Sequence, residues 1–180
     1  MITYNPYIGQ TEPEGIDLYG YAKSWVDMVP HVDQLKGYAS EAHRIIEFGL
    51  RGGVSTWALL DGLPANGSLI GVDIDPGALI AKRVREDPRF TFIVGDSVKV
   101  KLPSAGADLV MIDSSHEYDQ TVEELKVADR LAPKRIILHD YLYHDTPAVK
   151  RAVDGFVAFG DYKIEVVHPS SWGLAVLVLK

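Results

Sequence analysis

Five acidic residues stand at the ends of short apolar runs, where the strands of a parallel sheet would bring them together. They are Glu47, Asp73, Asp96, Asp113 and Asp140. The first precedes a glycine-rich segment, residues 49–53, in which a tight turn lets a ligand approach the backbone closely. Carboxylates in such places can accept hydrogen bonds from sugar hydroxyls, attract a cationic ligand or hold a hard metal ion. The sequence therefore indicates a ligand-binding edge rich in negative charge.

The glycine-rich segment favours an adenosine-containing ligand over a dinucleotide or a triphosphate. Asp73 ends the next apolar run, where an acid can accept both hydroxyls of a ribose. The G-x-G-x-x-G pattern of dinucleotide sites is missing, and so is the G-x-x-x-x-G-K-[ST] pattern of triphosphate sites. Glu47, two positions before Gly49, suits a cationic cofactor better than a pyrophosphate. The alternative is that Glu47 only ends a strand and that the glycines only form a turn.

The chain between these acids alternates strand-like with helical patterns. Strands are expected at residues 44–48, 68–73, 90–94, 108–113, 135–139, 162–167 and 173–179, the last two as an antiparallel pair. Helices are expected at residues 55–63, 78–86, 118–131 and 146–159, with two short helices divided by Pro30 within residues 18–39. Alternating strands and helices predict a parallel sheet with right-handed crossovers and a ligand at the carboxyl ends of its strands.

Composition narrows the functional classes. The 180 residues include 25 Asp and Glu against 18 Lys and Arg, a net charge of −7, which argues against binding to nucleic acid. No cysteine is present, so disulfides, thiolate nucleophiles and cysteine zinc sites are excluded. No apolar run approaches the roughly 20 residues that span a bilayer, and no signal-peptide pattern opens the chain. We expect a cytoplasmic protein without a membrane partner; the sequence leaves open whether it is a homo-oligomer.

The motifs, taken in order, resemble the class I S-adenosylmethionine-dependent methyltransferases. Glu47, Gly49 and Gly53 fall on the E-x-G-x-x-x-G pattern of that family. Later segments, D-x-x-H-x-Y at residues 113–118 and H-D-Y at residues 139–141, look like the small-molecule O-methyltransferase subgroup, methyltransferase domain family 24. That subgroup includes sugar and macrolide O-methyltransferases and relatives of cephalosporin-biosynthesis enzymes. The resemblance implies a Rossmann-like, doubly wound α/β fold: a three-layer αβα arrangement around seven strands, mostly parallel with an antiparallel C-terminal strand.

The resemblance also assigns roles to individual residues. S-adenosyl-L-methionine would be bound by Glu47, Gly49, Arg51, Gly53, Ser55, Asp73, Asp96, Ser97 and Asp113. His116 would take the proton of the acceptor hydroxyl, with Asp113 as its catalytic partner. The single domain, residues 1–180, would comprise an N-terminal helical lid segment at 1–43 and a cofactor-binding core at 44–180.

A divalent cation such as Mg²⁺ is the second expected cofactor. Asp113 and Asp140 would converge as hard oxygen ligands, and His139 or His144 could complete the site, although a histidine shifts the preference toward transition metals. Metal-using relatives have two adjacent acids where this chain has His139 and Asp140. The alternative is that Asp113 orders the methionine end of the cofactor and Asp140 caps the following segment.

The expected function is methyl transfer to a hydroxyl group of a small molecule. Two other functions stay open at this stage. One is an NAD-dependent oxidoreductase, against which the missing G-x-G argues. The other is a non-catalytic cofactor-binding module of the same fold.

Overall fold

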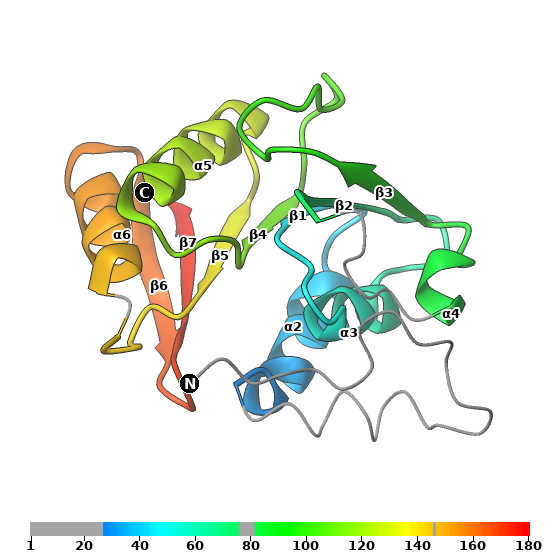
Figure 1. Ribbon diagram of the computed structural model, residues 1–180, viewed down its shortest axis with the longest axis horizontal. Helices are drawn as coiled ribbons and strands as arrows, with labels where there is room; N and C mark the ends of the chain where they lie inside the picture. Colours follow the sequence, from blue (N-terminus) through cyan, green and yellow to red (C-terminus); the bar gives the residue numbers. More distant parts are fainter. Residues whose placement is uncertain (1–26, 76–81, 146) are drawn as a thin grey trace.

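Seven strands form one sheet in the order β3-β2-β1-β4-β5-β7-β6 (Figure 1). The computed structural model describes residues 27–75, 82–145 and 147–180. The strands are β1 (Arg44–Phe48), β2 (Ser68–Asp73), β3 (Phe90–Val94), β4 (Leu109–Ile112), β5 (Arg135–His139), β6 (Tyr162–His168) and β7 (Leu174–Leu179). The strands β1 to β5 pair in parallel, and β7 pairs antiparallel to both β5 and β6. The predicted fold class is confirmed.

The parallel register brings the carboxyl ends of the central strands to one level. Phe48 at the end of β1 pairs with Val72 of β2 on one side and with Ile112 of β4 on the other. The chain order reverses between β1 and β4, and such switch points are where open α/β sheets bind ligands.

Helices cover both faces of the sheet, which gives three layers (Figure 1). They are η1 (Val29–His31), α2 (Val32–Ser40), α3 (Val54–Gly62), α4 (Lys82–Arg85), α5 (Tyr118–Leu131) and α6 (Pro147–Phe159). Successive strand residues point to opposite faces. Ile45 accordingly packs with residues of α2 and α3, and Ile46 packs with residues of α5 and α6. The alternation separates two apolar cores, one on each side of the sheet.

Most predicted elements agree with the structure to within a residue or two. The helix expected at 78–86 is described only from Lys82 to Arg85. Within the expected N-terminal helices, Pro30 lies in η1, and α2 packs its buried Leu35 and Ala39 into the core. Most of the proposed lid, residues 1–26, lies outside the described residues. None of the described helices is both long and apolar enough to cross a membrane.

One carboxyl group is enclosed within the sheet layer. Glu47 in β1 is fully buried; the Ser55 hydroxyl donates to its Oε1 at 2.5 Å, while its Oε2 has no hydrogen-bond partner. Burial disfavours the ionised form and raises the pKa of Glu47 to about 8, against its ordinary value of 4.5. Glu47 is therefore neutral in the folded protein at pH values where it would be charged in the unfolded chain.

Neutral Glu47 makes stability dependent on pH. Because the pKa of Glu47 is higher in the folded protein, the folded state binds the proton more tightly than the unfolded chain does. The protonated side chain therefore makes its full contribution to the free energy of unfolding below about pH 4.5, and this contribution is lost as the pH rises toward about 8. We expect the wild type to lose on the order of 2–3 kcal/mol of unfolding free energy relative to Glu47→Gln between about pH 5.5 and 8. Urea denaturation at both pH values measures this, with the exposed Glu123→Gln as control. If the free energy of unfolding changed equally with pH in the wild type and in Glu47→Gln, the raised pKa of Glu47 would be contradicted.

Substitution by alanine should have opposite effects on stability at two helical glycines, because their surroundings differ. A Cβ on Gly62 of α3 would lie 2.1 Å from the carbonyl oxygen of Lys36 in α2, whereas a Cβ on Gly155 of α6 meets nothing within 4 Å. Gly62→Ala should destabilise the protein by about 1–3 kcal/mol because the helices must move apart. Gly155→Ala should stabilise it by about 0.5–1 kcal/mol because alanine restricts the unfolded chain. Thermal unfolding of the two variants should show a lower Tm for Gly62→Ala and a higher Tm for Gly155→Ala than for the wild type. Equal changes in Tm would refute the packing argument.

Candidate active site

A cleft of about 450 Å³ opens at the carboxyl ends of the central strands. Its walls come from the segments that follow β1, β2, β3 and β4 and from the first turns of α5. The residues that line it are Gly49, Arg51, Val72, Asp73, Ile74, Asp75, Gly95, Asp96, Ser97, Asp113, Ser114, Ser115, His116, Gln120 and Glu124. Five of them are acidic and Arg51 is basic, so the lining carries an excess of negative charge.

The loop after β1 is held against the loop after β4. Gly49 has a φ of +83°, and its amide donates to the carbonyl oxygen of Val72 at 2.9 Å. A Cβ at this position would lie 2.2 Å from the carbonyl oxygen of Asp113. Glycine is therefore required both by the left-handed backbone and by the close approach of the two loops.

Asp73 closes the same loop from the side of β2. Its Oδ2 accepts hydrogen bonds from the amides of Leu50 at 2.8 Å and Arg51 at 3.2 Å, and its Oδ1 accepts from the amide of Asp75 at 2.9 Å. The carboxylate thus orders the glycine-rich loop, and its remaining lone pairs lie at the wall of the cleft.

The side of the cleft formed by α5 contains two polar residues that no motif of the sequence indicates, Gln120 and Glu124. Glu124 is fully buried, and its Oε1 accepts from the Ser97 hydroxyl at 2.5 Å and from the Gln120 amide at 3.3 Å. Its Oε2 accepts from the Ser114 hydroxyl at 2.6 Å. Burial raises the pKa of Glu124, and the three hydrogen bonds oppose that rise. The available signal was a glutamate within the stripe of α5 that also carries the buried Thr121 and Leu125.

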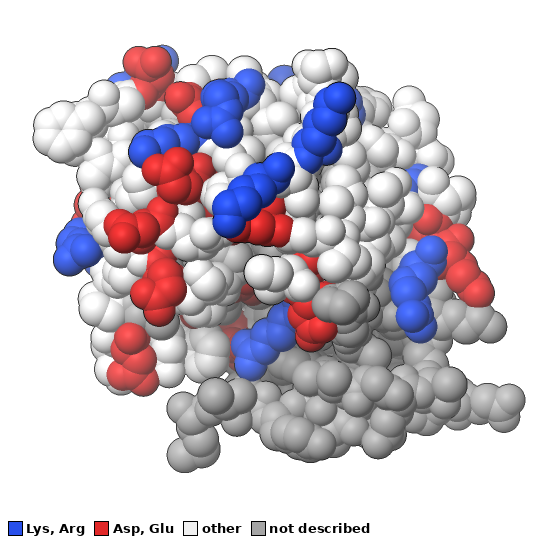
Figure 2. All heavy atoms as spheres, turned by 45° about the horizontal axis from the view of Figure 1, so that its top comes forward, with Lys and Arg blue, Asp and Glu red and all other residues white. Residues whose placement is uncertain are grey.

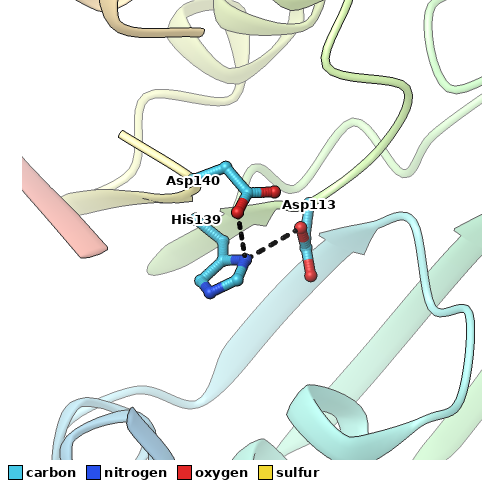
Figure 3. A group of neighbouring side chains, drawn as sticks. All are labelled: Asp113, His139 and Asp140. Atoms are coloured by element: carbon cyan, nitrogen blue, oxygen red, sulfur yellow. Dashed lines mark ion pairs between the residues drawn. The ribbon is translucent and has the colours of Figure 1, made fainter. Parts of the chain in front are cut away.

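Two aspartates and two histidines meet at the ends of β4 and β5. Figure 3 shows three of them, Asp113, His139 and Asp140, pointing toward one another. His139 Nδ1 lies 3.3 Å from Asp113 Oδ1 and 3.4 Å from Asp140 Oδ1. His116 Nε2 lies 2.7 Å from Asp140 Oδ2 and 3.3 Å from Asp113 Oδ1. His116 and Asp140 are non-glycine residues with φ of +60° and +61°, a conformation that is retained mainly where the surroundings enforce it.

The charges in this cluster balance one another. Burial opposes ionisation of all four groups, yet hydrogen bonds to the two carboxylates raise the pKa of His116 to about 9. The negative charge of Asp113 likewise holds the pKa of the buried His139 well above its usual value. The histidines in turn lower the pKa values of Asp113 and Asp140. His116 Nε2 thus forms a hydrogen bond with Asp113, and each histidine forms ion pairs with both aspartates.

The predicted site residues divide into two groups. Those that line the cleft are Gly49, Arg51, Asp73, Asp96, Ser97, Asp113 and His116. Glu47, Gly53, Ser55, His139 and Asp140 are not among the lining residues. Glu47 and Ser55 bond to each other beneath the loop, and Asp113 connects the cleft to His139 and Asp140. His144 is 84% exposed and pairs with Asp145 rather than with the cluster.

Comparison with known proteins agrees with this geometry. A family model described as a methyltransferase domain matches residues 46–141. No curated protein matches the chain.

Solved structures with the same fold include three bacterial proteins. The O-methyltransferase TomG from Streptomyces achromogenes, in complex with SAM, has a TM-score of 0.73 and 16% identity over 94% of this chain and 91% of that chain. An O-methyltransferase from Bacillus cereus, in complex with SAH, has a TM-score of 0.70 and 19% identity; the match covers 91% of this chain and 87% of that chain. Cofactor-bound Rv0187 from MTB has a TM-score of 0.74 and 20% identity over 93% and 92%. At these identities the likeness shows a shared fold.

The family match runs from β1 to the residues just after β5, so it includes every strand end at which the cleft and the Asp–His cluster are built. It also extends over more than half of the chain. The protein therefore belongs to the methyltransferase domain family.

Proposed function

We propose that the protein transfers a methyl group from S-adenosylmethionine to a hydroxyl group of a small molecule. One observation carries the proposal: a single cleft joins Asp73, the acid suited to a ribose, to Asp113 and His116, the groups suited to an acceptor hydroxyl. When bound, the cofactor supplies a methyl group on a positively charged sulfur. The acidic lining of the cleft is complementary to that charge.

The residues at the two ends of the cleft would have different tasks. Asp73 would accept the ribose hydroxyls while it holds the amides of Leu50 and Arg51. Asp96 and Ser97 would face the adenine. At the other end, His116 in its neutral form, which becomes populated as the pH approaches its raised pKa of about 9, would accept the proton that the acceptor hydroxyl loses as its oxygen bonds to the methyl carbon. Alignment of oxygen, methyl and sulfur supplies much of the rate in such a displacement.

We infer a small acceptor rather than a nucleic acid. The net charge of the chain is −7, and a phosphate-backbone ligand requires an excess of Lys and Arg at its binding surface. On the face drawn in Figure 2, the described basic and acidic side chains are interspersed. The cleft itself, at about 450 Å³, has the size of a small-molecule site.

Binding of S-adenosylhomocysteine tests the proposal. Calorimetric titration should give saturable binding, NAD should give none, and Asp73→Ala should weaken the affinity about 10- to 100-fold because the ribose hydroxyls lose a charged acceptor. Asp161→Ala, at an exposed position between α6 and β6, should leave the affinity unchanged. Binding of NAD instead would favour the oxidoreductase, and the absence of S-adenosylhomocysteine binding would overturn the proposal.

We further propose that Asp113, His139 and Asp140 hold a divalent metal ion. Their ligand atoms lie within 4.8 Å of one another, and Asp140 Oδ1 is buried without a hydrogen-bond partner. Two carboxylates with one imidazole fit Mn²⁺ or another transition metal better than Mg²⁺, which prefers oxygen ligands alone. A bound cation would lower the pKa of a substrate hydroxyl. His139 can ligate a cation only without its proton, so a bound cation would replace that proton, and it would compete with protonated His116 for the two carboxylates.

Metal binding can be measured without knowledge of the acceptor. Mn²⁺ titrated into the metal-stripped protein should bind more tightly than Mg²⁺, followed by the electron paramagnetic resonance signal of free Mn²⁺. Asp140→Asn should weaken Mn²⁺ binding at least about tenfold because a charged ligand is lost. Asp145→Asn is the matched control, since Asp145 is exposed and pairs with His144. Equal Mn²⁺ binding by wild type and Asp140→Asn would exclude this site.

A further inference from the structure

Glu124 connects two loops that no backbone hydrogen bond of the sheet joins directly. Ser97 belongs to the loop after β3 and Ser114 to the loop after β4, on either side of the central strands β2 and β1. Both hydroxyls donate to the one carboxylate, Ser97 at 2.5 Å and Ser114 at 2.6 Å. All three residues also line the cleft. The carboxylate therefore fixes the separation and the orientation of two cleft walls.

This arrangement gives the wall a defined hydrogen-bonding polarity. A serine hydroxyl has one hydrogen to donate and two lone pairs to accept. Since both hydrogens are directed at Glu124, each serine can offer a ligand only an acceptor. The Gln120 amide donates to Ser97 at 2.9 Å and to Glu124 at 3.3 Å, so its two hydrogens are also directed into the network. The nearby carboxylate of Asp96 adds a further acceptor at the cleft.

We propose that Glu124 is a positioning residue that turns Ser97 and Ser114 into hydrogen-bond acceptors, so that this wall selects a purine carrying an amino group over one carrying a carbonyl group. The inference rests on the proposed function, because the amino purine would be the adenine of the cofactor. A purine with a carbonyl oxygen in place of the amino group would place an acceptor against the serine oxygens, which are also acceptors. No hydrogen bond could then form, and desolvated acceptors without a donor weaken binding.

The test compares S-adenosylhomocysteine with its deaminated analogue, S-inosylhomocysteine. The wild type should bind the adenine compound at least about tenfold more tightly than the inosine compound. In Glu124→Gln the side chain keeps its size but gains an NH₂ donor. One serine must then accept from it and can direct its own hydrogen to the cleft. The ratio of the two affinities should fall below about threefold, whatever the change in absolute affinity.

Two further variants keep the test decisive. Glu123→Gln makes the same chemical change one residue earlier, at an exposed side chain that pairs with Lys126, and should keep the wild-type ratio. Ser114→Ala removes one acceptor from the wall and should also reduce the ratio; it decides the question if Glu124→Gln does not fold. A wild type that binds both compounds equally, or variants that weaken both equally, would overturn the role of Glu124. Failure to bind either compound would instead refute the proposed function.

Discussion

The close approach of Gly49 to Asp113 is the constraint on which the site depends. No side chain fits between the two backbones, so the loops after β1 and β4 lie directly against each other. The amide of Asp113 donates to the carbonyl oxygen of Phe48 at 2.8 Å, which continues the β1–β4 pairing to the edge of the sheet. This contact sets the distance between the loop that Asp73 orders and the cluster to which Asp113 belongs. The cleft and the Asp–His cluster thus share Asp113.

The carboxylates at this edge behave differently because their surroundings differ. Asp73 accepts from backbone amides, Asp113 and Asp140 face histidines, and Glu124 accepts from hydroxyls. Glu47 receives one hydroxyl hydrogen bond in complete burial, so its raised pKa keeps it protonated near neutral pH. Residue type alone thus does not fix the charge of a strand-end acid; its hydrogen-bond donors and its exposure to water do.

Much of the site could be predicted because its residues follow strands whose limits are evident from local patterns. Asp73 and Asp113 end apolar runs, and the parallel sheet brings such ends together. Glu124 could not be selected in this way, since it lies in the middle of α5 and acquires its role only when the helix packs beneath two loops. Glu47 shows the opposite case: its motif position suggested cofactor contact, whereas its carboxyl group is enclosed below the loop.

The sequence by itself determined the order of strands and helices, the glycine at the crowded turn and the acids at the strand ends. Each of these depends on a local preference: residue periodicity, backbone conformation or the limit of an apolar run. Only the tertiary structure decided which acids face the cleft, which are neutral, and that His116 and His139 are shared between the same two aspartates. Those properties depend on distances between segments remote in the chain and on exclusion of water, and neither is encoded in any single stretch of residues.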